Sequence, residues 1–241
     1  IGSWSNVLPL DQAVRLLARG ELPTRAAAIT FDDGYADNHA VAMPLLLRHR
    51  VPATFFIATG YLDGGQMWND TVIEAVRHCR QRVLELSALG LGDHDVSSLS
   101  CRRATIGTIL GRIKYEPMAR RAELARRIAE AADAPPVGGL MLRTDELREM
   151  HRAGLQIGAH TVTHPILATI DDATGPQEIA ASPHELHEIV GVGTRQETAV
   201  GTIGELLHQA RPQRLGERPP NLPVGQRRIE NLACVVCGNV A

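Results

Sequence analysis

The chain has 241 residues, of which 44% are hydrophobic and 22% are charged, so it is long and apolar enough to bury a sizeable core and is neither disordered nor fibrous. Its formal net charge of -2 gives no bulk attraction to nucleic acid or to an anionic membrane surface. No stretch approaches the roughly 18 to 20 apolar residues of a membrane span. We therefore expect a globular protein without a nucleic-acid partner or a membrane span.

Apolar runs and helical periodicity alternate along the chain. In chain order they predict a helix at 10–20, a strand at 26–31, a helix at 36–49 interrupted at Pro44, a strand at 53–60, helices at 69–80, 117–133 and 143–154, a strand at 155–160, and a helix at 176–190 interrupted at Pro183. Strand, helix and strand at this spacing indicate a βαβ unit. The predicted class is α/β, with a parallel sheet covered by helices.

Two adjacent carboxylates follow the first predicted strand. Asp32 and Asp33 come directly after the apolar run at 26–31 and before Gly34. Two like charges at a buried strand end should repel each other and raise one pKa unless a cation neutralises them. One interpretation is that one carboxylate binds a metal while the other serves as a general base. The alternative is ordinary turn chemistry, with Asp32 capping the next helix and Asp33 solvated.

A pair of histidines follows a second predicted strand. His160 and His164 lie four residues apart, just after the apolar run at 155–160. Imidazole suits zinc and neighbouring transition metals, and either a helix or a tight turn can bring such a pair together. Ligands of α/β folds gather at the carboxyl ends of parallel strands. One aspartate and two histidines would leave positions open for water and substrate, as a hydrolytic metal site requires.

These residues resemble a known family. The segments "TFDDG" at 30–34 and "HTVTH" at 160–164 are similar to the two motifs of the polysaccharide deacetylases of carbohydrate esterase family 4, the NodB-homology domain. The intervening segment "RHRVPATFFIATGYLDGG" is also similar, and the resemblance runs from about residue 7 to 190. It implies an irregular (β/α) barrel and a substrate that is an acetylated polysaccharide or oligosaccharide. We expect a soluble protein, and the compartment stays open between the bacterial cytoplasm and the cell envelope.

The resemblance also implies a role for each matching residue. It makes Asp32 the catalytic base, and makes Asp33, His160 and His164 the ligands of a divalent metal, zinc or cobalt. The backbone N–H of Tyr35 would help to hold the oxyanion. Trp68 is a candidate to stack on a sugar ring, with packing beneath the following helix as the alternative.

The family pattern is broken near both ends. The sequence begins after the position of the family's first strand, and no Tyr or Phe follows Tyr115, so the family's later Arg-x-x-(Tyr/Phe)-Pro segment is absent. His208 formally fits the family's Leu-x-His motif, whose histidine is the general acid, but it comes too early in the chain and lies in a helical pattern. We therefore predict an incomplete barrel, with a partial catalytic domain at 1–190 and an atypical, poorly packed tail at 191–241, which a coding frame change near Gly191 would explain.

Two alternative functions stay open at this stage. The chain could be a non-catalytic protein that binds metal or carbohydrate, or an amidase that acts on small non-peptide amides. The spacing of Cys234 and Cys237 is found in redox pairs and zinc ribbons, but the sequence offers no second pair of ligands.

Overall fold

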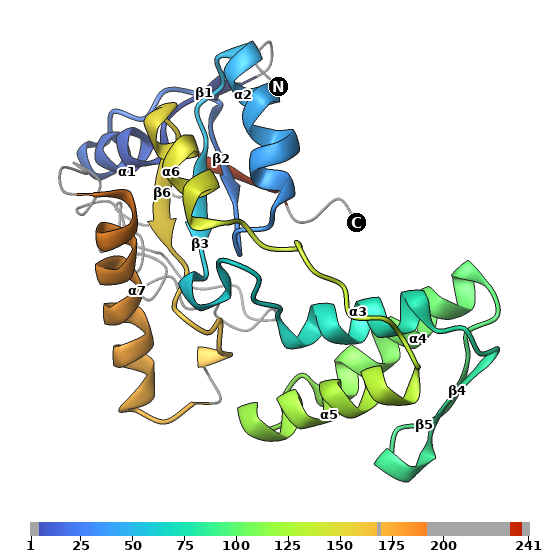
Figure 1. Cartoon of the computed structure of the whole chain (residues 1–241). Helices are drawn as coiled ribbons and strands as arrows, with labels where there is room; N and C mark the ends of the chain where they lie inside the picture. Colours follow the sequence, from blue (N-terminus) through green and yellow to red (C-terminus); the bar gives the residue numbers. More distant parts are fainter. Residues whose placement is uncertain (1–4, 168–169, 192–231, 238–241) are drawn as a thin grey trace, which may run out of the picture. The chain divides into compact units, whose positions relative to one another are not determined.

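The computed structural model describes residues 5–167 and 170–191, and the backbone of residues 232–237 (Figure 1). The chain forms two compact units. The first comprises residues 1–63, 142–164 and 176–241, and the second comprises residues 64–141 and 165–175. Strands and helices are mixed in the way that the sequence predicted, so the α/β class is confirmed.

A parallel sheet forms the centre of the first unit. Four of its five strands are β1 (Asn6–Val7), β2 (Ala26–Phe31), β3 (Thr54–Ile57) and β6 (Gln156–Ala159), in the order β1-β2-β3-β6. All three neighbouring pairs run parallel. The strands predicted at 26–31, 53–60 and 155–160 are therefore confirmed, while the two-residue β1 was not predicted. The described strands form an open sheet, as expected for an incomplete barrel.

Helices accompany this sheet in the first unit. They are α1 (Leu10–Arg19), the π-helix η1 (Asn38–Ala42), α2 (Met43–His49), the short η2 (Thr59–Tyr61), α6 (Thr144–Arg152) and α7 (Thr174–Val190), whose residues from Pro176 belong to this unit. Pro44 lies in the first turn of α2, and the interruption expected there takes the form of the preceding π turn. Pro183 does not break α7, which continues through it to Val190.

The core of the first unit lies between the sheet and these helices. Phe55 and Ile57 of β3 are fully buried together with Leu142, Leu147 and Met150. The rings of Phe31 and Phe55 stack across β2 and β3, with centroids 4.6 Å apart. This packing fixes the ends of the strands from which the polar residues emerge.

The second unit has its own core. It contains α3 (Trp68–His78), β4 (Val83–Leu86), the short η3 (Ser87–Leu89), β5 (Gly92–Asp95), α4 (Leu99–Ile113) and α5 (Met118–Ala131). The antiparallel β4 and β5 and the helix α4 were not predicted from the sequence. One hydrophobic cluster joins the hairpin to two of the helices, through the fully buried Leu84 of β4, Ile109 of α4 and Ile128 of α5.

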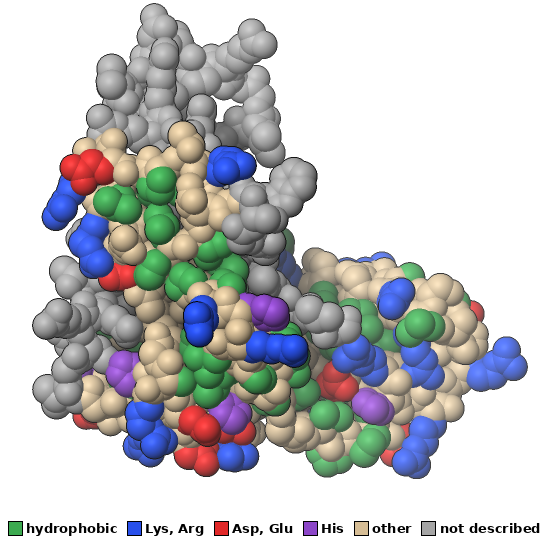
Figure 2. All heavy atoms as spheres, turned by 90° about the horizontal axis from the view of Figure 1, so that it is seen from above, with side chains coloured by type: hydrophobic (Ala, Val, Ile, Leu, Met, Phe, Trp, Pro, Cys, Tyr) green, Lys and Arg blue, Asp and Glu red, His purple; other side chains and the backbone are tan. Residues whose placement is uncertain are grey.

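Charged side chains on α5 are largely solvated. Arg126 pairs with Glu123 at 2.7 Å and also with Glu130 on the same helix. Figure 2 shows Lys and Arg side chains interspersed with acidic, apolar and other groups on the face that it presents. Such exposed pairs contribute little to stability. None of the described helices combines the length and hydropathy needed to cross a bilayer.

Much of the predicted tail, including His208, lies outside the described residues. The exception is β7 (Leu232–Cys237), which pairs in parallel with β2 from Ala26↔Leu232 to Phe31↔Cys237. The sequence did not predict this strand, and it gives six residues of the tail a place in the sheet. The domain boundary at residue 190 stays a prediction.

The turn after β2 generates a stability prediction. Gly34 has a φ of +88°, and an added Cβ would lie 3.2 Å from Cγ2 of the buried Ile57. We expect Gly34→Ala to lower the free energy of unfolding by roughly 1–3 kcal/mol, measured by urea denaturation. Gly111→Ala is the control, because this exposed glycine lies within α4 with open space around it. It should gain about 0.5–1 kcal/mol. Equal stability of Gly34→Ala and the wild type would contradict the prediction.

Candidate metal centre

Three parallel strands bring the motif residues to one edge of the sheet. β3 lies between β2 and β6, with Phe31 opposite Phe55 and Ile57 opposite Ala159. The backbone continues this pairing beyond the strands. Ala58 donates its N–H to the carbonyl oxygen of Asp33 at 3.2 Å, and His160 donates its N–H to the carbonyl oxygen of Ile57 at 2.9 Å. Residues more than a hundred positions apart in the chain are thus held side by side.

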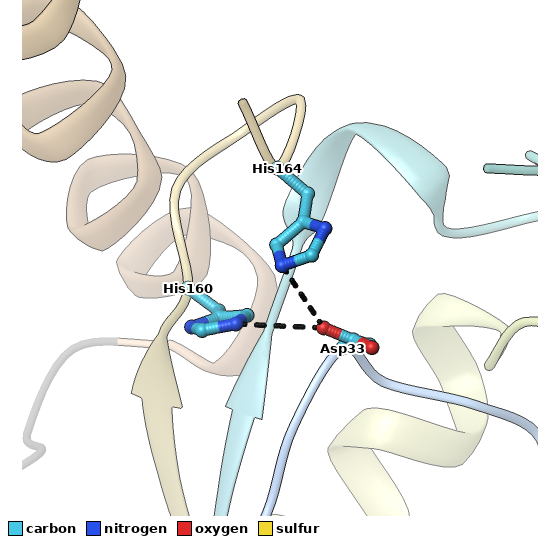
Figure 3. A group of neighbouring side chains, drawn as sticks. All are labelled: Asp33, His160 and His164. Atoms are coloured by element: carbon cyan, nitrogen blue, oxygen red, sulfur yellow. Dashed lines mark ion pairs between the residues drawn. The ribbon is translucent and has the colours of Figure 1, made fainter. Parts of the chain in front are cut away.

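Three side chains converge at this edge, as Figure 3 shows. The Nε2 atoms of His160 and His164 each lie 3.4 Å from Oδ1 of Asp33. The two imidazole rings have centroids 4.9 Å apart and are tilted by 35°. The convergence that the sequence predicted is therefore confirmed. Each of the three side chains is between 23% and 39% exposed, so water and a ligand can reach them.

The donor set and its spacing fit a divalent metal. Candidate ligand atoms of Asp33, His160 and His164 all lie within 4.8 Å of one another, and no other such group of three occurs in the described ranges. Zinc bonds to imidazole nitrogen and carboxylate oxygen of about 2.0–2.2 Å imply ligand separations of roughly 3.3–3.6 Å in a tetrahedron. The two separations of 3.4 Å from Asp33 meet this requirement without rearrangement.

Asp32 is half-buried beside the cluster. Burial raises the pKa of Asp32 above its ordinary value, and although the nearby His160 and His164 act in the opposite direction, the charge of Asp33 adds to the increase. A carboxylate with a raised pKa holds a proton more readily than an ordinary surface aspartate. This is the direction that suits a general base.

The backbone is strained at the cluster. Seven residues other than glycine have positive φ within the described ranges, and three of them are Asp33 at 75°, Thr161 at 64° and His164 at 49°. At Asp33, the N–H of Gly34 donates to the carbonyl oxygen of Asp32 at 2.9 Å, which closes a γ-turn. Conformations of this kind cost roughly 1–3 kcal/mol each and persist only where surrounding contacts enforce them.

The turn formed by residues 160–164, here called the histidine turn, is held first by residues of η2. The N–H of Thr59 donates to the carbonyl oxygen of Thr161 at 3.3 Å, and that of Gly60 donates to the carbonyl oxygen of Val162 at 2.9 Å. The hydroxyl of Tyr61 donates to the carbonyl oxygen of Thr163 at 2.8 Å. Three successive carbonyl groups of an irregular segment are thus satisfied by three successive residues.

The other side of the histidine turn contacts Glu178 of α7, a residue that the sequence analysis did not select. Oε2 of Glu178 accepts the N–H groups of Val162 at 2.8 Å and Thr163 at 2.9 Å. Its Oε1 accepts the Thr163 hydroxyl at 2.6 Å. Glutamate on an amphipathic helix usually faces solvent, so its position in the sequence carried no signal.

The remaining predicted residues have different surroundings. Tyr35 is buried directly after the γ-turn, and the role of its N–H stays a prediction. Trp68 belongs to the second unit, where the guanidinium carbon of the buried Arg121 lies 4.9 Å from its ring centroid. The ring also packs against the core of that unit. These contacts favour the packing role for Trp68, while its role in sugar binding stays a prediction.

A family model described as polysaccharide deacetylase matches residues 19–205. The chain belongs to the polysaccharide deacetylase family. The resemblance drawn from "TFDDG" and "HTVTH" is therefore confirmed. A search of curated proteins found no match.

This member of the polysaccharide deacetylase family is similar to several solved deacetylase structures, at low sequence identity. Streptococcus pyogenes deacetylase PplD in complex with acetate shares 18% identity at a TM-score of 0.43, over 85% of this chain and 63% of that one. A de-N-acetylase from Aggregatibacter actinomycetemcomitans shares 16% identity at a TM-score of 0.40, and the match covers 78% of this chain and 60% of that one. The BpsB deacetylase domain from Bordetella bronchiseptica shares 16% identity at a TM-score of 0.41, and the match covers 85% of this chain and 70% of that one. The chain thus spans less than two thirds of the first two structures.

The contacts of Trp68 generate a prediction for the second unit. Trp68→Ala should lower the free energy of unfolding by about 2–4 kcal/mol, because it removes a ring that packs against the core and Arg121. Tyr115→Ala is the control, since Tyr115 is 69% exposed in the same unit and should change stability by about 0.5 kcal/mol or less. Urea denaturation of both variants measures the difference. An unchanged stability of Trp68→Ala would remove the packing role and favour sugar stacking.

Proposed function

We propose that this chain is a metal-dependent hydrolase that removes N- or O-acetyl groups from a polysaccharide or oligosaccharide. The observation that carries the proposal is the convergence of Asp33, His160 and His164 beside Asp32 at one edge of the sheet. Membership of the polysaccharide deacetylase family supports the reaction class and a carbohydrate substrate. Zinc is the first candidate for the ion and cobalt the second, since both accept two imidazoles and a carboxylate.

Asp33, His160 and His164 would hold the ion through one carboxylate oxygen and two Nε2 atoms, the atoms that already face one another. A divalent ion bound there supplies Lewis-acid polarisation of the acetyl carbonyl and lowers the pKa of water. The imidazoles act in their neutral form, since protonated nitrogen is no ligand. The γ-turn at Asp33 directs one aspartate to the histidines and leaves its neighbour Asp32 available for the reaction.

Asp32 is assigned as the general base. It takes a proton from water while the water oxygen adds to the acetyl carbonyl carbon. The backbone N–H of Tyr35 then stabilises the negative charge on the former carbonyl oxygen. Breakage of the bond from the acyl carbon to the sugar nitrogen or oxygen releases acetate, and the leaving group takes up a proton. No residue within the described ranges is assigned as the donor of that proton, and His208 lies outside them.

Substitutions separate the base from the metal ligands. Asp32→Asn should keep zinc binding and lose about 10²-fold or more in turnover, because it removes only the proton acceptor. His160→Ala should lose zinc binding itself, because one of three ligands is gone. Zinc binding is measured by competition with a fluorescent chelator, and turnover as acetate released from an N-acetylated chitin-type oligomer.

The control for these variants is Asp37→Asn. Asp37 is exposed and its side chain makes no capping hydrogen bond at the start of η1. It should therefore match the wild type in both assays. Full turnover of Asp32→Asn would refute the assignment of the base, and undiminished zinc binding by His160→Ala would refute the metal site.

Removal of the metal tests the reaction class. Dialysis against a chelator should abolish acetate release, and zinc or cobalt added back should restore it, because one backbone N–H does not replace the Lewis acid that the proposed reaction requires. Zinc binding without acetate release from any acetylated saccharide would instead indicate a non-catalytic binding protein. Hydrolysis of small amides with no release from saccharides would indicate an amidase.

A further inference from the structure

Two successive amide groups of the histidine turn share one acceptor. Val162 and Thr163 lie between the two histidines, and both donate their N–H groups to Oε2 of Glu178, at 2.8 and 2.9 Å. The Thr163 hydroxyl adds a third hydrogen bond, to the other carboxylate oxygen. One side chain thus accepts three hydrogen bonds from two successive residues of the turn.

We propose that Glu178 is a positioning residue that holds the histidine turn in its metal-binding conformation and thereby sets the affinity of the site for zinc. The inference rests on the proposed function, because it assigns Glu178 a role toward the ion held by Asp33, His160 and His164. Glu178 itself faces the backbone of the turn and is not among the ligands.

The geometry explains why the turn needs such an acceptor. Thr161 and His164 flank the contacted amides, and both have positive φ. A β-branched threonine in this conformation is a genuine outlier, so the segment would relax if it were free. The carbonyl groups of residues 161–163 are held by η2, and the amide groups of residues 162 and 163 are held by Glu178. Removing either set loosens the backbone that carries the ring of His164.

The position of α7 supports the same role. Glu185 lies about two helical turns after Glu178 and accepts the hydroxyl hydrogen bond of Thr59, the residue whose N–H holds the turn at Thr161. One face of α7 therefore contacts both the histidine turn and the segment behind it. Burial raises the pKa of Glu178, but the hydrogen bonds from Thr163 and Val162 outweigh it and lower the pKa below the ordinary value. The carboxylate is therefore ionised at neutral pH and accepts all three bonds.

The close approach at Gly60 shows how little room the turn has on its other side. A Cβ added to Gly60 would lie 2.8 Å from the carbonyl oxygen of Val162. The turn cannot shift toward η2 to compensate for a lost contact, so loss of Glu178 should free it to move on the side of α7. The two distances of 3.4 Å that define the metal site would then no longer be maintained.

The test compares zinc affinity with the stability of the metal-free protein. Glu178→Ala should weaken zinc binding by about 10- to 100-fold, as expected when a residue that orients a ligand is lost. Glu178→Gln should stay within about threefold of the wild type, because its amide oxygen can accept both N–H groups and its NH₂ can donate to the Thr163 hydroxyl. Glu188→Ala is the control on the same helix, since Glu188 is 70% exposed and contacts only His184 among the described ion pairs. It should bind zinc like the wild type.

Amide hydrogen exchange of the metal-free protein provides a second readout. Val162 and Thr163 should exchange faster in Glu178→Ala than in the wild type, while the strand amides of β3 should not change. If Glu178→Ala shows no cooperative thermal transition, Thr163→Val replaces it. That variant loses the hydroxyl hydrogen bond to Glu178 and should bind zinc about fivefold more weakly.

Three outcomes would overturn the inference. One is a zinc affinity of Glu178→Ala equal to that of the wild type. This result would contradict the role of Glu178 but not the proposed metal site. Another is equal loss in Glu178→Gln and Glu178→Ala, which would show that charge rather than hydrogen bonding is responsible. The last is absence of zinc binding by the wild type, which would remove the proposed function together with this role.

Discussion

The parallel register of β2, β3 and β6 is the constraint on which the candidate site depends. Phe31 lies opposite Phe55, and Ile57 lies opposite Ala159. Asp33 and His160 therefore both follow the carboxyl ends of these strands, at the same edge of the sheet. A slip of one residue between β3 and β6 would turn every side chain of β6 to the other face. The stacked rings of Phe31 and Phe55 and the fully buried Ile57 oppose such a slip. Apolar packing below the edge therefore specifies the polar geometry above it.

The site combines a strained backbone with many hydrogen bonds to that backbone. Asp33 and His164, two of the three proposed ligands, lie in a conformation that residues other than glycine rarely adopt. The γ-turn is centred on Asp33, the aspartate whose carboxylate lies 3.4 Å from both histidines. In the histidine turn, contacts with η2 and α7 offset the strain. These contacts stabilise a backbone conformation that the same turn would not keep in isolation.

Much of this arrangement could be predicted from the sequence. The apolar runs at 26–31 and 155–160 placed Asp32, Asp33 and His160 at carboxyl ends of parallel strands, and the spacing of the histidines added His164.

The β4 and β5 hairpin was missed because "GDHD" has no apolar alternation. The side chain of Asp93 supports the hairpin by accepting the N–H groups of Leu86 and Ser87. Helix α4 was missed although Ser98 accepts the N–H of Cys101 as a cap, since Gly107 and Gly111 weaken its helical pattern. The role of Glu178 depends on tertiary contacts that no local pattern encodes.

The separation of the motifs along the chain has a consequence for biosynthesis. Asp33 leaves the ribosome long before the histidines, and α7, which contacts their turn, is made later still. At translation rates of about 5–20 residues per second, the interval between Asp33 and Glu178 lasts roughly 7–30 s. During that time the second unit, whose residues 64–141 are encoded between the two halves of the sheet, can fold around its own core. The contacts of Glu178 with the histidine turn therefore form only after α7 has been translated, so the proposed metal site would be completed no earlier than that helix.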